Sequence, residues 1–279
     1  MGKQTAALVA CGDLGVRLAG LLDQQAWRCL GLRRNPGALP AFLEGVAADV
    51  TQPGALHVLA QEAPALLLFT PTPVSRDAAG YRAGFADAAR NVVDGLDGHV
   101  PDLVLLVSST RVYAERDGGW VDESAPLNRE EEAARAIVEA EETFLEALPT
   151  AVVLRAGGLY GDGPGYLLRR VAAGELTPRE PLRFSNRVHR DDVAGFLAQL
   201  ATKGAGERIY NVVDDDPASM QEVEAWLCEA LGRPYAPPGA LPGKPRGHKR
   251  ISNRRLRESG YTLRYPDYRA GYSEVLRRQ

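Results

Sequence analysis

The chain alternates short apolar runs with amphipathic segments, and this alternation limits the fold more than any other feature. Five runs have the length of β-strands: TAALVA (5–10), WRCLGL (27–32), ALLLFT (65–70), LVLLVSS (103–109) and AVVLRA (151–156). None alternates strictly between apolar and polar residues, which is typical of strands covered on both faces. Helices are expected between them at 14–24, 82–96 and 129–148. This order predicts an α/β fold with a doubly wound parallel sheet.

The texture of the sequence changes after about residue 157, with a glycine-rich loop (GGLYGDGPG) and stretches rich in proline and arginine at 175–190 and 233–251. We expect residues 1–156, with about 190–215 returning to them, to form a nucleotide-binding domain. Residues 157–189 and 216–279 would form a smaller substrate-binding region. Within it, Ser219 and Glu222 have the capping-box spacing at the start of a helix at 218–231. Residues 251–261 predict a short helix capped by Ser252 and ended by Gly260, with Leu256 and Tyr261 packed inward.

Composition narrows the class of protein. The 279 residues are 45% hydrophobic and carry a net charge of −3, which gives no global electrostatic case for binding nucleic acid or an anionic membrane. The three cysteines, Cys11, Cys29 and Cys228, are far apart, so they suit a reducing compartment and form no metal site. The first apolar run is too short to span a bilayer. We therefore expect a cytoplasmic protein with no metal, membrane or nucleic-acid partner.

A candidate nucleotide-binding turn follows the first apolar run. In LVACGDLGVRLAGLL (8–22) the strand leads into Gly12, Asp13, Leu14 and Gly15 and then into an apolar helix. Such a turn gathers backbone N–H groups and the positive end of a helix, where a pyrophosphate can be held. Ala10 replaces the first glycine of the G-x-G-x-x-G fingerprint, a tolerable change if its backbone φ stays negative. An ordinary strand-to-helix turn is the alternative.

Two arginines follow the second strand, at the position that distinguishes the two nicotinamide dinucleotides. About 20 residues after the turn, NAD-binding folds place an acidic residue on the ribose 2′-hydroxyl, whereas an arginine accommodates the 2′-phosphate of NADP. Arg33 and Arg34 occupy this place, and guanidinium groups bind phosphate through paired hydrogen bonds. The pattern predicts NADP(H), with a solvated basic turn as the alternative. Asp49, after a further strand, either accepts from the adenine amine or is an ordinary loop aspartate.

Several motifs spread over most of the chain give it a family resemblance. They are ACGDLG at the start, ADVT, VSSTRVYAE, LRAGGLYGDGPG, RVHRDDVA (187–194) and ISNRRLRESGY (251–261). Together they resemble the extended and atypical short-chain dehydrogenase/reductases, including the NAD-dependent epimerase/dehydratase family, and in particular a subgroup of short epimerase-like NAD(P)-binding proteins. The resemblance implies a Rossmann-type domain, a small C-terminal substrate-binding region and a cofactor lying across the strand ends.

The resemblance also implies a catalytic Ser or Thr, a Tyr that exchanges a proton with the substrate, and a Lys four residues after it. A cation beside a phenol favours its ionised form, and the serine orients the oxygen whose proton moves. Ser109 matches the serine, but the Tyr-x-x-x-Lys pair is missing. The tyrosine position falls near Glu131 and the lysine position near Arg135. Arg135 keeps a cation for ribose or nicotinamide-side oxygens but cannot exchange protons as lysine does.

Three side chains are candidates for the missing acid. Tyr113 follows the strand that carries Ser109, Tyr160 lies in the glycine-rich loop, and His189 lies where the resemblance implies the substrate cleft. Each also has a structural interpretation, as a wall or core tyrosine, a loop tyrosine or a hydrogen-bonded histidine before a helix. We take Ser109 and Tyr113 as the candidate catalytic residues and Tyr160 and His189 as candidate substrate contacts.

A basic segment lies near the C-terminus, in GKPRGHKRISNRRLRE (243–258). Its basic residues are Lys244, Arg246, His248, Lys249, Arg250, Arg254, Arg255 and Arg257. Little aromatic interleaving and a negative net charge argue against nucleic acid. Arg250 on a loop over the cleft would suit an anionic substrate such as a nucleotide diphosphate sugar, and the alternative is a solvated basic helix face.

Two functions follow from these patterns. The first is an NADP(H)-dependent oxidoreductase or epimerase-like enzyme that exchanges hydride with a small hydroxyl- or carbonyl-bearing substrate. The second is an NADP(H)-binding sensor or scaffold without turnover, which the missing Tyr-x-x-x-Lys pair favours. Family members often dimerise through paired helices, and we expect 82–96 and 130–147 to be the pairing segments.

Overall fold

The computed structural model describes residues 2–161, 163, 165–240 and 247–278. The chain divides into two compact units. Unit 1 comprises Met1–Val112, Leu127–Arg155 and Val193–Tyr210, and unit 2 comprises Tyr113–Pro126, Ala156–Asp192 and Asn211–Gln279. Residues 113–126, which the sequence pattern groups with the nucleotide-binding part, thus belong to unit 2, because they pair with segments from the C-terminal part of the chain.

A seven-stranded sheet forms the centre of the fold, in the order β10-β7-β5-β4-β1-β2-β3. The strands are β1 Gln4–Val9, β2 Trp27–Arg33, β3 Glu44–Ala47, β4 Leu66–Phe69, β5 Leu103–Ser109, β7 Ala151–Ala156 and β10 Ile209–Val212. β1 pairs in parallel with β2 and β4, β2 with β3, and β4 with β5. This confirms the doubly wound, Rossmann-type α/β fold. The strand order reverses around β1, which places the end of β1 where such folds bind their ligands.

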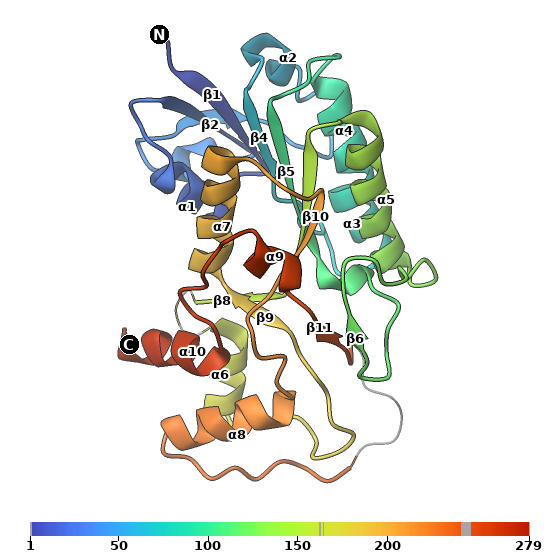
Figure 1. Cartoon of the computed structure of the whole chain (residues 1–279), viewed down its shortest axis with the longest axis vertical. Helices are drawn as coiled ribbons and strands as arrows, with labels where there is room; N and C mark the ends of the chain where they lie inside the picture. Colours follow the sequence, from blue (N-terminus) through green and yellow to red (C-terminus); the bar gives the residue numbers. More distant parts are fainter. Residues whose placement is uncertain (1, 162, 164, 241–246, 279) are drawn as a thin grey trace. The chain divides into compact units, whose positions relative to one another are not determined.

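Helices cover both faces of the sheet, with α1 and α7 on one side and α3, α4 and α5 on the other (Figure 1). Their bounds are α1 Asp13–Leu21, α2 Val58–Glu62, α3 Ala78–Tyr81, α4 Ala88–Gly95, α5 Glu132–Ala147 and α7 Arg190–Lys203. A π-helical turn, Arg82–Asp87, joins α3 to α4. All four residues of β4 are buried, which explains why its run does not alternate.

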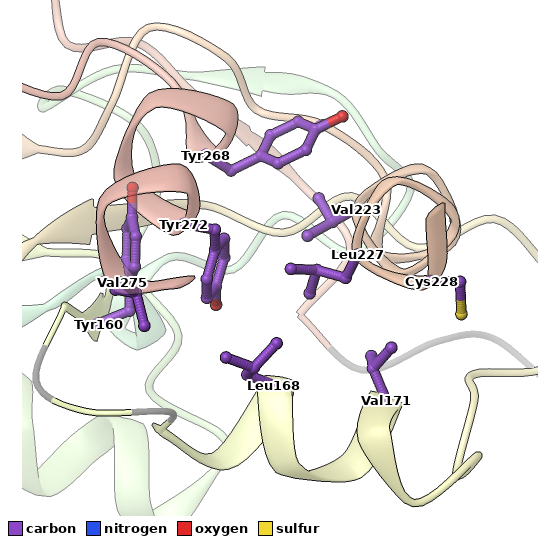
Figure 2. Close-up of a cluster of buried hydrophobic side chains, with 10 residues drawn as sticks. Tyr160, Leu168, Val171, Val223, Leu227, Cys228, Tyr268, Tyr272 and Val275 are labelled. Atoms are coloured by element: carbon purple, nitrogen blue, oxygen red, sulfur yellow. The ribbon is translucent and has the colours of Figure 1, made fainter. Parts of the chain in front are cut away.

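Unit 2 contains two short parallel strand pairs and a helical core. β8 (Gly158–Tyr160) pairs with β9 (Arg187–His189), and β6 (Trp120–Val121) pairs with β11 (Arg250–Ile251). The helices are α6 Gly165–Ala172, α8 Met220–Ala230, α9 Arg254–Glu258 and α10 Tyr268–Arg277. Apolar side chains of α6, α8 and α10 point toward one another in Figure 2, and together with Tyr160 they form a buried cluster.

The helix ends in unit 2 follow the predicted chemistry in one case and depart from it in another. Ser219 caps α8, and its hydroxyl oxygen accepts a hydrogen bond from the Glu222 N–H at 3.1 Å. For α9 the prediction is wrong by one residue. Asn253 is the N-cap, and the Ser252 hydroxyl accepts only a long bond, 3.4 Å, from the Arg254 N–H. Ser252 is displaced because its own N–H donates to the Val121 carbonyl, which extends the β11 segment toward the helix.

Candidate functional site

The glycine turn lies at the carboxyl end of β1, near the middle of the sheet. Gly12 is the N-cap of α1 and has no side chain to compete for the first N–H groups of the helix. A Cβ atom at Gly12 would meet only the Ala10 carbonyl oxygen, at 3.8 Å, so the backbone here is open to close approach. A Cβ atom at Gly15 would lie 2.9 Å from the Cys11 sulfur, so this glycine permits close packing of helix on strand. Both positions fit the roles of the second and third fingerprint glycines.

Ala10 adopts a left-handed conformation, with φ of 55°. The expectation of a negative φ is therefore wrong. Two hydrogen bonds hold the turn in this shape: the Thr70 hydroxyl donates to the Ala10 carbonyl at 3.0 Å, and the Cys11 N–H donates to the Leu32 carbonyl at 2.9 Å. A non-glycine residue in this region costs roughly 1–2 kcal/mol. The turn thus keeps the conformation of a glycine turn although its first residue is alanine.

Arg33 and Arg34 lie beside this turn. The register pairs Val9 with Leu32, so the residues that follow each strand emerge together at one edge of the sheet. Arg33 is close enough to Cys11 for its charge to act on the thiol. Burial raises the pKa of Cys11 to about 11, and the charge of Arg33 acts in the opposite direction. Arg33 is half-buried and Arg34 is exposed. Two guanidinium groups therefore stand next to the candidate pyrophosphate turn.

Asp49 follows β3 at the same edge. Its carboxylate accepts hydrogen bonds from the Thr51 N–H at 3.0 Å and the Thr51 hydroxyl at 2.8 Å. The backbone bond from Thr51 is the main reason that the pKa of Asp49 is lowered, and the charge of Arg34 adds to it. These contacts satisfy the loop-aspartate interpretation, and the adenine contact stays a prediction.

The carboxyl end of β5 carries a cluster of polar side chains. The Ser109 hydroxyl accepts a hydrogen bond from the Arg111 N–H at 3.2 Å. The Arg111 side chain donates to the Tyr81 hydroxyl at 2.9 Å and to the Glu131 carboxylate. Burial, the largest single influence, would lower the pKa of Arg111, but the hydrogen bonds and charges of Glu131 and Tyr81 together outweigh it, and the pKa is raised. Ser109, Tyr81, Arg111 and Glu131 therefore form one connected polar site within unit 1.

A second buried network holds β5 from below this site. Glu141 of α5 accepts hydrogen bonds from the Ser108 hydroxyl at 2.5 Å and from two nitrogens of Arg155, the shorter of them 2.7 Å. The side chains of Arg155 and Glu141 are only 3% and 2% exposed. This network joins β5, α5 and β7 directly before Ser109.

Tyr113 lies in unit 2 and is fully buried. Its hydroxyl donates to the Asn211 side-chain oxygen at 2.6 Å, and its carbonyl accepts from the Lys249 ammonium at 2.8 Å. Tyr160 and His189 are also buried, and their rings meet edge to face at 5.3 Å. Burial raises the pKa of Tyr160 well above its usual range. The three sequence candidates for the acid are thus all packed inside unit 2.

Arg250 and Arg257 of the basic segment are bound to acceptors of their own unit. Arg250 donates to the Gly118 carbonyl at 2.9 Å, and its guanidinium lies over the rings of Trp120 and Phe184 at 5.4 and 4.8 Å. Arg257 pairs with Asp215 at 2.8 Å. Lys244 and Arg246 lie outside the described residues. Among the residues described, neither a metal-binding group of His, Cys, Asp or Glu nor a helix long and apolar enough to cross a membrane is found.

Comparison with known proteins places the chain in a family. No family model matches the chain. A solved structure assigned as an NAD-dependent epimerase/dehydratase, from Methylobacillus flagellatus, is 34% identical and aligns over 99% of this chain and 98% of that one, with a TM-score of 0.80. The chain belongs to the NAD-dependent epimerase/dehydratase family.

Two curated proteins are also similar to this chain along most of their length. Protein YeeZ of Escherichia coli K12 is 28% identical over 276 residues, which is 94% of this chain and 96% of YeeZ. The 3-diazoavenalumate denitrifying reductase of a Streptomyces species is 26% identical over 254 residues, which is 84% of this chain and 82% of the reductase.

Two α5 positions depart from the family pattern that the sequence motifs imply. Glu131, at the implied tyrosine position, is the N-cap of α5 and binds Arg111. Arg135, at the implied lysine position, is exposed and forms two long ion pairs, 3.9 Å to Glu132 and 4.0 Å to Glu139. The sequence predictions missed Arg111, although it lies inside the quoted motif VSSTRVYAE. They also missed Tyr81, which no local pattern marks because only the fold brings it to Arg111.

Proposed function

We propose that the protein is an NADP(H)-dependent oxidoreductase or epimerase-like enzyme that exchanges hydride with a small hydroxyl- or carbonyl-bearing substrate. The observation that carries this proposal is the pairing of Val9 with Leu32, which brings Arg33 and Arg34 beside the Gly12 turn. The turn presents open backbone and a helix N-terminus to a pyrophosphate, and the two guanidinium groups lie next to it, where a 2′-phosphate needs charge.

Bound NADP(H) would supply or accept the hydride, and the residues of this chain would hold and orient it. Gly12, Asp13, Leu14 and Gly15 would bind the pyrophosphate, Arg33 and Arg34 the 2′-phosphate, and Asp49 the adenine amine. On the other side, Arg135 would meet ribose or nicotinamide-side oxygens, and Ser109 would orient the reacting oxygen of the substrate. One similar protein carries the name of a reductase, which agrees with hydride transfer.

The cofactor part is tested by titrating the protein with NADPH and with NADH and following the fluorescence of the reduced nicotinamide. We expect tighter binding of NADPH, and a loss of this preference by about 10- to 100-fold in Arg33→Ala/Arg34→Ala, because each charge-assisted hydrogen bond contributes about 1.5–3 kcal/mol. The matched control is Arg90→Ala/Arg129→Ala, which removes two exposed arginines from ion pairs elsewhere in unit 1. Equal affinity of the unaltered protein for the two cofactors refutes the NADP preference.

The substrate part of the proposal concerns the charge of the substrate. We infer an anionic substrate, of which a nucleotide diphosphate sugar is one class, from the basic residues of unit 2 around Arg250. Turnover is tested by following NADPH absorbance at 340 nm with a panel of aldehydes, ketones, quinones and nucleotide-sugar ketones. Oxidation of NADPH by a member of the panel supports the enzyme.

A sensor or scaffold that binds NADP(H) without turnover is the second candidate. The observation that favours it is the presence of Glu131 and Arg135 where the family resemblance implies Tyr and Lys. NADPH binding with no oxidation across the panel, and no effect of Ser109→Ala on binding, supports the sensor. Dimer formation through 82–96 and 130–147 stays a prediction that sedimentation of the purified chain can test.

A further inference from the structure

We propose that Tyr81, held by Arg111, is the general acid that gives a proton to the substrate oxygen, in place of the tyrosine that α5 lacks. This inference rests on the proposed function and names a further catalytic residue for it. It comes from the polar cluster at the end of β5, which no pattern in the sequence brings together.

The Tyr81 hydroxyl is hydrogen-bonded to a cation, the guanidinium of Arg111. The Arg111 guanidinium donates to the Tyr81 hydroxyl at 2.9 Å, and its carbon lies 4.9 Å from the centre of the Tyr81 ring. A guanidinium that donates to a phenol oxygen stabilises the negative charge left when the proton departs. Glu131 binds the other arm of Arg111 and fixes the direction of the fork. Arginine here supplies the charge that lysine supplies in a Tyr-x-x-x-Lys pair, but from the segment after β5 instead of from α5.

The position of Tyr81 is rigid. The ring stacks on Phe85, which is buried, with 5.8 Å between ring centres and planes 9° apart. Both backbone groups of the preceding residue, Gly80, are hydrogen-bonded: its N–H donates to the Asp77 carboxylate at 2.8 Å, and its carbonyl accepts from the Val74 N–H at 3.0 Å. Tyr81 also stands directly before the π-helical turn, a distortion that often accompanies functional sites.

The cluster lies at the same edge of the sheet as the cofactor turn. Val9 of β1 pairs with Phe69 of β4, and Phe69 pairs with Leu106 of β5, so all three strands point their carboxyl ends to one edge. Ser109 ends β5 there, and its hydroxyl is bound to the backbone of Arg111. Tyr81 is half-buried, so its hydroxyl group can meet a ligand at this edge. The three tyrosine and histidine candidates from the sequence are instead at most 8% exposed.

The proton transfer balances with the reduced cofactor as hydride donor and the solvent as the source of the proton that restores Tyr81. When bound, the reduced nicotinamide would supply hydride to the carbonyl carbon, and the carbonyl π electrons would move onto the substrate oxygen. That oxygen takes the proton from the Tyr81 hydroxyl, and the electron pair of the broken O–H bond stays on the phenolate. Arg111 stabilises this charge until water returns a proton to Tyr81.

The first test does not depend on turnover. N-acetylimidazole acetylates accessible tyrosine hydroxyls, and peptide mass spectrometry reports each site separately. We expect saturating NADPH to slow acetylation of Tyr81 at least 5-fold and to leave Tyr166, which is 72% exposed, unchanged. Acetylation of Tyr81 at equal rates with and without NADPH overturns the proposal.

The second test uses Tyr81→Phe, which keeps the ring stack and removes only the hydroxyl, with Tyr166→Phe as the matched control. On whichever panel carbonyl the unaltered protein reduces, we expect kcat to fall about 100-fold in Tyr81→Phe, with the Kd for NADPH within 2-fold of the original. Arg111→Lys should retain more of kcat than Arg111→Gln, because it keeps the cation. An active protein in which Tyr81→Phe keeps kcat within 2-fold overturns this proposal alone. An unaltered protein that binds no NADPH, or binds it without turnover, overturns the proposed function instead.

Discussion

Replacing Arg155 by methionine removes one partner of the buried ion pair between Arg155 and Glu141, which lies directly before the candidate site at the end of β5. Methionine is close to arginine in length and leaves the carboxylate of Glu141, 2% exposed, without its cation. The Ser108 hydroxyl then still donates to it. A buried carboxylate without a cation either lowers the stability of the fold or takes up a proton.

The size of the effect can be worked out from the proton that the variant must bind. A glutamic acid of ordinary acidity titrates near pH 4.3, so keeping it neutral at pH 7 costs about 2.7 pH units at about 1.36 kcal/mol each, or about 3.7 kcal/mol. This lies within the range of about 3–5 kcal/mol for breaking one side of a buried pair. At pH 5 the same cost is about 1 kcal/mol. The destabilisation by Arg155→Met should therefore grow as the pH rises.

The measurement is urea unfolding followed by circular dichroism at pH 5 and pH 7, with hydrogen exchange of peptides from β5, β7 and α5. Exchange is needed because a chain of two compact units need not unfold in one step. The matched control is Arg129→Met, which breaks an exposed pair with Glu142 on the same helix and should cost less than about 1 kcal/mol. The double variant Glu141→Leu/Arg155→Met should recover part of the loss, because no charge is left buried.

Two results would refute this reasoning. A loss below about 1 kcal/mol at pH 7 would mean that the pair is not buried as the structure has it. An equal loss at pH 5 and pH 7 would mean that Glu141 takes up no proton when its cation is removed.

Three other predictions concern single residues. Burial raises the pKa of Asp214 to about 8, so the stability linked to its proton is complete below about pH 4 and is lost as the pH rises through about 8. Asp214→Asn should remove this loss, on the order of 5 kcal/mol at pH 9, and an unchanged stability profile between pH 5 and pH 9 would contradict it. Ala10→Gly should raise the free energy of unfolding by roughly 0.5–1 kcal/mol without changing the Kd for NADPH, because φ is 55° there; a destabilised variant would disprove the turn geometry. Cys11, buried and with a pKa raised to about 11, should react with a thiol reagent only after denaturation, as a colorimetric thiol count over time would show.

Much of the fold could be predicted because its signals are local. The run at 103–109 is β5 with the same bounds, and the run at 151–156 is β7. A strand buried on both faces has an unbroken apolar run, and this run can be recognised without knowing which strands are its neighbours. The glycine turn was equally readable, since its helix N-terminus and its two glycines are contiguous.

The rest was out of reach because it depends on contacts between distant segments. The sign of φ at Ala10 is set by hydrogen bonds to Thr70, which follows β4, and to Leu32 of β2 through the neighbouring Cys11. The N-cap of α9 moved by one residue because Ser252 follows a strand paired with β6, 130 residues earlier in the chain as measured from Ile251 to Val121. Neither partner can be inferred from the local sequence.

Periodicity and short motifs are properties of contiguous residues, so the sequence alone predicts the Rossmann-type sheet and a candidate dinucleotide-binding turn and shows that Tyr-x-x-x-Lys is absent. Which side chains meet at the end of β5 depends on how the strands pair in the folded chain. Tyr81 and Arg111 are 30 residues apart in the chain and become hydrogen-bonded because β4 and β5 are parallel neighbours whose following segments leave the sheet at one edge. The same parallel pairing of β1 and β2 brings Arg33 to the turn. Parallel strands collect chemistry from distant parts of a chain at one edge, and a linear sequence does not show which residues will be collected.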